Sequence, residues 1–134
     1  MDTRPKILFV EDNIKLREVG VIKLKQSGYD VIELSDGKNT LKVMEKEKPD
    51  LLLLDILLPH KDGYEVLEDI KSSKSAVIKS IPVVILSNLN NENDIFEAKE
   101  LGAYDYLVKA NVTLEGIVEK VRQVLEEKKM GKRG

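Results

Sequence analysis

Five short apolar segments recur along the chain, and each is followed by a polar turn and then by a longer stretch with helical spacing. The apolar segments cover residues 6–10, 29–34, 51–54, 81–86 and 104–108. Short apolar runs bounded by Pro, Gly, Asn or Asp are typical of buried strands. The pattern therefore predicts five β-strands.

Apolar residues at helical spacing predict five helices between and after these strands. The helices cover about residues 14–26, 38–48, 63–72, 94–101 and 114–128, and residues 76–78 add at most a turn. Asn13 and Thr113 are suitable N-caps for the first and last of them. Short alternating units force parallel strands joined by right-handed crossovers, so we expect one doubly wound α/β domain over residues 1–128. Residues 129–134 are expected to form a basic, flexible tail.

The most hydrophobic strand, four consecutive leucines at 51–54, leads directly into Asp55. Pro49 stops the helix before this strand, and Pro59 turns the chain after it. Asp55 is therefore expected at the carboxyl end of a central strand, the edge where open α/β sheets collect ligands. Taken alone, an aspartate there is more often a turn former or a helix cap than a functional residue, so the residues at the other strand ends are needed to decide between these interpretations.

Polar side chains of complementary chemistry follow the other strands. Glu11 and Asp12 follow the first strand, Ser87 the fourth and Lys109 the fifth, and parallel strand ends gather at one edge beside Asp55. Two carboxylates about 4 Å apart repel by roughly 4 kcal/mol at an effective dielectric near 20. Three clustered acids therefore call for a cation, and an all-oxygen ligand set suits Mg²⁺. A carboxylate beside Mg²⁺, a hydroxyl and an ammonium is equipped to hold a phosphoryl group itself.

The composition of the chain excludes several classes of function and of site. The 134 residues include 22 Lys+Arg against 24 Asp+Glu, and a net charge of −2 is not that of a domain that binds nucleic acid through its surface field. The chain has no cysteine, which excludes disulfides and Cys-ligated zinc, and its single histidine, His60, is expected in a loop. No apolar run approaches the roughly 20 residues of a membrane span, so we expect a cytoplasmic protein without membrane contact.

The chain resembles the receiver domain of two-component response regulators, of the single-domain kind similar to chemotaxis regulators. The residues that carry the resemblance span nearly the whole chain and are Glu11, Asp12, Asp55, Pro59, Asp62, Gly63, Ser87, Tyr106 and Lys109. The resemblance implies a flavodoxin-like fold with strand order 2-1-3-4-5. It also implies a signalling domain, not a turnover enzyme, that takes a phosphoryl group onto Asp55 from the phosphohistidine of a histidine kinase or phosphotransfer protein.

The same resemblance implies a magnesium site and a switch. Asp12, Asp55 and the backbone carbonyl of Leu57 would ligate Mg²⁺ directly, and Glu11 would act largely through water.

Ser87 and Lys109 would contact the phosphoryl oxygens, and Tyr106 would follow Ser87 inward as the switch. A downstream protein would then dock on the face made by the helix at 94–101, the strand at 104–108 and the last helix.

Two positions depart from the family pattern. Asn88 stands where Ala or Gly usually follows the hydroxyl residue, and Ala110 stands where the family lysine is usually followed by a cis-proline. A cis bond before Ala would cost about 2.5–4 kcal/mol, so we expect a trans bond with a rearranged loop or a strained cis bond held by the site. Leu57 and Leu89 flank the path of an attacking water in receivers and have no polar atom to orient it, so we expect slow self-dephosphorylation.

Two other functions remain open at this level. One is a phosphate-independent interaction scaffold with the same fold, which need not bind Mg²⁺. The other is a phosphohydrolase with an aspartyl-phosphate intermediate, but such enzymes carry Asp-x-Asp, and Leu57 occupies the position of the second aspartate. The sequence is equally compatible with a stand-alone receiver and with a receiver cut from a longer protein.

Overall fold

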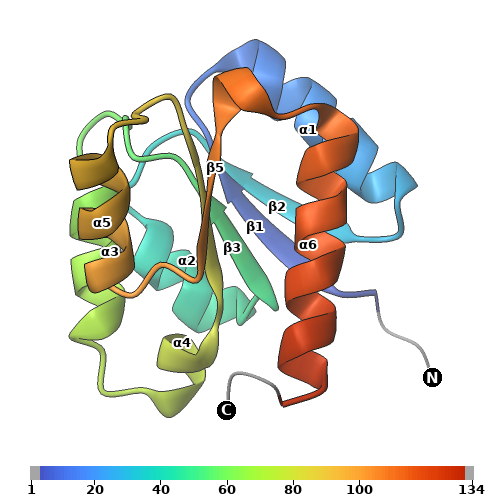
Figure 1. Cartoon of the computed structure of the whole chain (residues 1–134). Helices are drawn as coiled ribbons and strands as arrows, with labels where there is room; N and C mark the ends of the chain where they lie inside the picture. The colour runs from blue at the N-terminus through green and yellow to red at the C-terminus, as the bar shows by residue number, and fades with distance from the viewer. Residues whose placement is uncertain (1–3, 132–134) are drawn as a thin grey trace.

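The computed structural model describes residues 4–131 and contains one five-stranded parallel sheet in the order β2-β1-β3-β4-β5. The strands are β1 (Lys6–Val10), β2 (Asp30–Leu34), β3 (Leu51–Leu54), β4 (Val83–Ser87) and β5 (Asp105–Val108). Figure 1 shows the sheet at the centre with helices on both sides. The flavodoxin-like doubly wound fold and the strand order implied by the resemblance are both confirmed.

Within residues 4–131, six α-helices, not the predicted five, cover the sheet. They are α1 (Ile14–Gln26), α2 (Thr40–Glu47), α3 (Gly63–Lys71), α4 (Ala76–Ser80), α5 (Glu92–Glu100) and α6 (Leu114–Lys129). The extra helix is α4, where only a turn was expected. Ser75 caps it by accepting a hydrogen bond from the amide of Ile78, and the Ile78 side chain is buried in the core. At five residues, α4 is too short for a hydrophobic period to reveal it.

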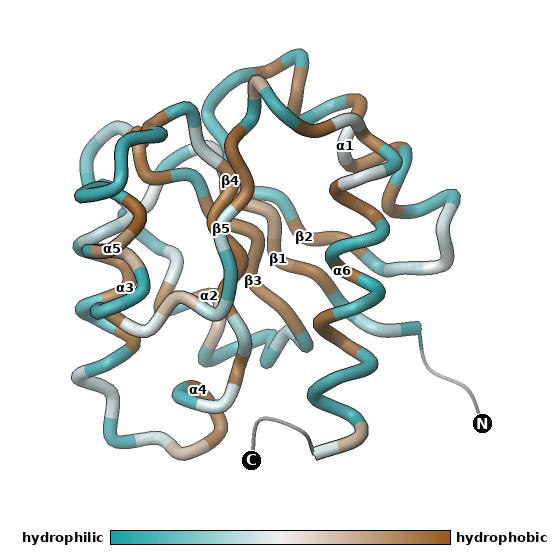
Figure 2. The backbone as a smooth tube through the Cα atoms, viewed as in Figure 1, coloured by the Kyte–Doolittle hydropathy of each residue, from teal (hydrophilic) through white to brown (hydrophobic). Residues whose placement is uncertain are grey.

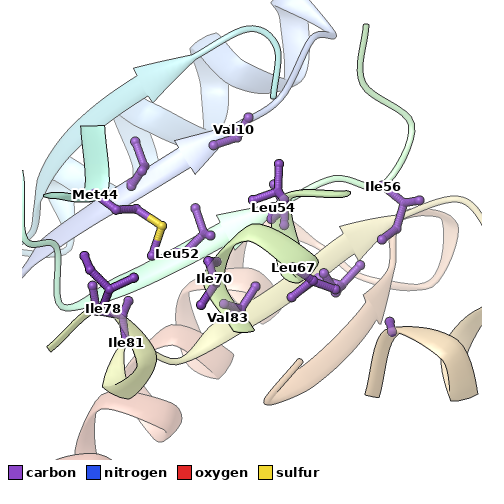
Figure 3. Close-up of a cluster of buried hydrophobic side chains, with 14 residues drawn as sticks. Val10, Met44, Leu52, Leu54, Ile56, Leu67, Ile70, Ile78, Ile81 and Val83 are labelled. Atoms are coloured by element: carbon purple, nitrogen blue, oxygen red, sulfur yellow. The ribbon is translucent and has the colours of Figure 1, made fainter. Parts of the chain in front are cut away.

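The central strand β3 is buried on both faces and separates two hydrophobic clusters. Leu52 and Leu54 point into the cluster covered by α2, α3, α4 and α5, which Figure 3 shows in close-up. Leu51 and Leu53 point into the cluster covered by α1 and α6. Consecutive leucines are thus used on opposite faces, as the period of two along a strand requires. In Figure 2 the hydrophobic colour is accordingly concentrated in the central strands.

The two outermost strands, β2 and β5, are less buried than the strands between them. Every residue of β3 and β4 is buried, whereas β5 is half-buried throughout and β2 exposes Asp30 and Glu33. Each outer strand has a neighbouring strand on one side only.

The last helix extends into the segment predicted as a tail. α6 ends at Lys129, and Met130 and Gly131 form its C-terminal turn. Residues 132–134 of the predicted tail 129–134 lie outside the described residues. Within residues 4–131, none of the helices is both long and apolar enough to cross a membrane.

Candidate functional site

The ends of four strands bring the predicted site residues to one edge of the sheet. The registers pair Val10 with Leu54 and Leu54 with Ile85, so that the chain leaves β1 and β3 side by side. Glu11 and Asp12 follow β1 at this edge, and Asp55 follows β3. Ser87 is the last residue of β4 and pairs with Val108, directly before Lys109.

Glu11, Asp12 and Asp55 form an acidic cluster, with one carboxylate oxygen from each lying within 4.8 Å of the others. Glu11 and Asp55 are buried, with 0% and 2% of their surface exposed, whereas Asp12 is exposed. The cluster therefore has two carboxylates fixed in the protein interior and one that faces solvent.

Lys109 supplies the positive charge that the buried acids require. Its Nζ lies 2.6 Å from Oδ2 of Asp55 and 3.0 Å from the Glu11 carboxylate. Burial lowers the pKa of Lys109, but its hydrogen bonds to Asp55 and Glu11 raise it by more, so the pKa lies above its ordinary value. The lysine is therefore a fixed cation at neutral pH.

Backbone groups and one arginine hold Glu11 in place. The amide of Asn13 donates to Oε2 of Glu11 at 3.0 Å, and Arg17 donates from its guanidinium to the Glu11 backbone carbonyl at 2.7 Å. Burial nevertheless raises the pKa of Glu11, because the hydrogen bonds of Asn13 and Lys109 offset only part of the lost hydration. Sequence reasoning missed Arg17, since an arginine in the first turns of a helix carries no distinguishing signal.

The residues present fit a hard divalent cation. Among the described residues, Oε1 of Glu11 is one of two buried side-chain oxygens or nitrogens that accept no hydrogen bond, and its only close cation is the ammonium of Lys109 at 3.0 Å, which it shares with Asp55. The three carboxylates and the one ammonium leave two negative charges without a counter-charge in the cluster. An all-oxygen set with one exposed member matches the preference of Mg²⁺ for carboxylates plus retained waters. For Leu57, its amide donates to Oδ1 of Asp55 at 3.1 Å, while its carbonyl stays a predicted ligand.

The loop after Asp55 is fixed by local packing and capping. A methyl group on Gly63 would lie 2.5 Å from the backbone oxygen of Asp55, so only glycine permits this close approach. Asp62 then caps α3 and forms a reciprocal capping box with Glu65. The Asp62-Gly63 pair quoted for the resemblance thus has a structural cause. His60 lies in this loop, as expected, with positive φ, and its exposed imidazole lies 3.3 Å from the Asp36 carboxylate.

Ser87 and Tyr106 are linked through Leu89. The Leu89 amide donates a long hydrogen bond to Oγ of Ser87 at 3.4 Å, and the Tyr106 hydroxyl donates to the Leu89 carbonyl at 2.5 Å. Ser87 is fully buried and Tyr106 is half-buried, and burial raises the pKa of the tyrosine. The predicted hydroxyl and the predicted switch residue therefore share one short segment of backbone.

At the two positions that depart from the family pattern, the structure gives one clear outcome. The bond between Lys109 and Ala110 is trans, and residues Lys109–Asn111 form a 3-10 turn. This is the first of the two alternatives expected for Ala110. Asn88 is exposed beside Ser87, and the side chain of Leu57 is 54% exposed, while Leu89 is half-buried.

Comparison with known proteins places these residues in a family. A family model described as the response regulator receiver domain matches residues 7–127. PhoP of Bacillus subtilis, an alkaline phosphatase synthesis transcriptional regulatory protein, is 41% identical over 104 residues, which are 78% of this chain and 42% of PhoP. The transcriptional regulatory protein AfsQ1 of Streptomyces coelicolor is 32% identical over 105 residues, which are 78% of this chain and 44% of AfsQ1. The chain spans about two fifths of the length of these curated relatives.

Solved structures give the same result. The BeF3-activated receiver domain of RstA from Klebsiella pneumoniae superposes with a TM-score of 0.79 at 32% identity, covering 90% of this chain and 97% of that one. The chemotaxis response regulator CheY4 of Vibrio cholerae superposes with a TM-score of 0.82 at 26% identity, covering 91% of this chain and 99% of that one. The chain belongs to the receiver domain family of response regulators, the signalling domains of two-component systems.

Proposed function

We propose that this chain is a phosphorylation-dependent switch that accepts a phosphoryl group on Asp55. The observation that carries the proposal is the position of Lys109, whose ammonium lies 2.6 Å from the Asp55 carboxylate inside a cluster that keeps two uncompensated negative charges. Asp12 is exposed, so one of these charges lies in the buried part of the cluster, where Glu11 and Asp55 face the single ammonium of Lys109. An arrangement that served stability alone would be expected to balance its buried charges.

The donor is the phosphohistidine of a histidine kinase or of a histidine phosphotransfer protein. A carboxylate oxygen of Asp55 attacks phosphorus, and the phosphorus–nitrogen bond of the donor breaks. The leaving imidazole keeps the electron pair of that bond and carries its proton on the other nitrogen, so it departs neutral. Mg²⁺, when bound by Asp12, Asp55 and the Leu57 carbonyl, with Glu11 acting through water, supplies charge neutralisation for the phosphoryl oxygens.

Lys109 and Ser87 stabilise the product. Before phosphorylation, the Lys109 ammonium pairs with the Asp55 carboxylate. When this carboxylate loses its charge on forming the acyl phosphate, the ammonium pairs with a phosphoryl oxygen instead. The buried hydroxyl of Ser87 donates a hydrogen bond to another phosphoryl oxygen, and because its Oγ also accepts from the Leu89 amide, its movement toward the phosphoryl group draws the Leu89 segment with it. Tyr106, bonded to the Leu89 carbonyl, then follows this segment inward.

The switch changes the surface made by α5, β5 and α6. It is the surface predicted from the sequence, since the predicted helix at 94–101 is α5, the predicted strand at 104–108 is β5, and the last helix is α6. Phe96 on α5 exposes 65% of its surface there, the kind of large apolar side chain that a protein partner covers.

The curated relatives are longer proteins in which the matched receiver domain is only one part. PhoP and AfsQ1 are named as transcriptional regulators, and the matched residues are less than half of each. The net charge of −2 therefore bears on this domain alone, and it does not decide whether a protein that contains the domain acts on DNA.

The first test is the intact mass of the protein after incubation with acetyl phosphate and Mg²⁺. We expect one added phosphoryl group, absent in Asp55→Asn and absent when EDTA replaces Mg²⁺. Lys120→Met is a matched control, because it removes a lysine from an ion pair with Asp105 outside the site. If no mass is gained but the wild type binds Mg²⁺, Asn88 blocks small donors, and the phosphorylated partner kinase must be used instead. A chain that binds no Mg²⁺ and gains no phosphoryl group would be the phosphate-independent scaffold.

A further inference from the structure

Two tyrosine hydroxyls bind backbone carbonyls after Ser87, one in the segment that leads to α5 and one in the first turn of α5 itself. Tyr106 donates to the carbonyl of Leu89 at 2.5 Å, near the beginning of the segment. Tyr64 donates to the carbonyl of Asp94 at 3.2 Å, in the first turn of α5. Both rings pack against the same hydrophobic cluster. The backbone between Ser87 and the first turn of α5 is therefore bound by a tyrosine at two positions. Of these two tyrosines, only Tyr106 was assigned to the switch from the sequence.

Tyr64 belongs to a rigid part of the molecule. It is the second residue of α3, directly after Gly63, which is in close contact with the backbone of Asp55. The capping box of Asp62 and Glu65 fixes the same helical turn. The hydroxyl of Tyr64 is thus positioned from the loop that carries Asp55.

The helix at the other end of this hydrogen bond is held by little else. Within α5, Ala98 is the only buried residue, and Phe96 exposes most of its surface. Figure 1 shows α5 lying beside α3, and the second hydrogen bond between these helices joins the exposed ammonium of Lys71 to the Glu100 carbonyl at 3.3 Å. Because so little apolar surface fixes α5, a single partly buried hydrogen bond contributes substantially to its position.

We propose that Tyr64 is a positioning residue of the switch, whose hydrogen bond to the Asp94 carbonyl holds α5 in the unphosphorylated arrangement and is released on activation. The inference rests on the proposed function, since it requires that Asp55 takes a phosphoryl group. Burial also raises the pKa of Tyr64 to about 12, so the phenol remains a neutral donor throughout the physiological range.

The test is the affinity for beryllofluoride, a phosphoryl mimic, in the presence of Mg²⁺, followed by NMR of the backbone amides of α5. Tyr64→Phe keeps the ring and removes only the hydroxyl. Because the hydrogen bond stabilises the inactive arrangement alone, its loss should lower the midpoint of the titration about five-fold. In the free protein, the backbone amides of α5 should also exchange their hydrogens with solvent faster in Tyr64→Phe than in wild type. The free energy of this local opening should fall by more than the free energy of global unfolding.

Tyr104→Phe is the matched control. The Tyr104 hydroxyl donates to Glu127 at 2.6 Å on the other face of the sheet, far from the Ser87 segment, so its removal should leave the beryllofluoride midpoint at the wild-type value.

Two outcomes would overturn the inference. An unchanged midpoint in Tyr64→Phe would mean that the bond is kept in both arrangements, and a higher midpoint would mean that it belongs to the active one. Failure of the proposed function is distinguishable from either outcome. In that case wild type would not bind beryllofluoride, or Asp55→Asn would bind it equally well.

Discussion

Replacing Lys109 with methionine tests how much the ion pairs of Lys109 contribute to the free energy of unfolding. Methionine keeps an unbranched apolar stem and removes the ammonium that lies 2.6 Å from Asp55 and 3.0 Å from Glu11. Both acids are at most 2% exposed, so neither can recover its hydration without moving. Removing one partner of a buried ion pair costs about 3–5 kcal/mol, and we expect a loss of that size at pH 7 without Mg²⁺.

The loss should depend on pH with a definite sign. The folded-state pKa of Glu11 already lies above its ordinary value of 4.5, and removing Lys109 takes away an interaction that lowers it. The folded variant then binds more protons than the unfolded chain between pH 4.5 and the raised folded pKa, so its stability falls as pH rises through that window. The cost of Lys109→Met should therefore be small near pH 4.5 and largest at neutral pH.

The assay is urea unfolding of wild type and variant from pH 4.5 to 8, with and without Mg²⁺. Mg²⁺ should restore more stability to the variant, because it supplies the missing positive charge to the same carboxylates. Lys120→Met is the control. Its ion pair with Asp105 is partly exposed, with side chains 22% and 29% accessible, and should contribute about 0–1 kcal/mol. A Lys109→Met loss as small as that of the control, or one that does not vary with pH, would refute the reasoning.

Two further predictions concern stability and phosphoryl lifetime. Thr40 is fully buried and its hydroxyl has no hydrogen-bond partner among the described residues, so Thr40→Val should raise the free energy of unfolding by about 1 kcal/mol in urea titrations. Thr113→Val, which removes a hydroxyl that caps α6, should lower it by about 1 kcal/mol, and a loss in both variants would contradict the argument. If Asp55 is phosphorylated, polar replacements such as Gln at Leu57 and Leu89 should speed the decay of the acyl phosphate, measured by intact mass over time. Unchanged decay would show that these two leucines do not limit the access or orientation of water.

The fold was predictable because each strand and its carboxyl-terminal residue could be identified from local patterns. The leucine run ending in Asp55 is the clearest case, since its flanking prolines and its length leave little ambiguity. The order of the strands was not readable from those patterns and came only from the resemblance. Pairing depends on which apolar faces meet in three dimensions, and no single segment encodes that. Helix α4 was missed because Ser75 and Ile78 define a turn too short to show periodicity.

For the site, the sequence identified which side chains meet but not how they are supported. Placement at strand ends was enough to predict that Glu11, Asp55 and Lys109 come together. The contact of Arg17 with the Glu11 carbonyl and that of Tyr64 with the Asp94 carbonyl were not predictable. Both are side chains that bind backbone oxygens of a distant element, and backbone oxygens are the same in every residue. Such contacts become visible only once the elements are placed in space.

The incompletely buried outer strands of the sheet have a consequence for aggregation. A free strand edge can pair with the edge of another molecule, and a sheet with so leucine-rich an interior would then grow into a fibril. On β2, the exposed acids Asp30 and Glu33 would be brought against an incoming strand. On β5, Asp105 is held in an ion pair with Lys120 that an added strand would disturb. Both edges therefore carry charge that opposes edge-to-edge pairing, so the domain keeps an apolar core although its sheet has two free edges.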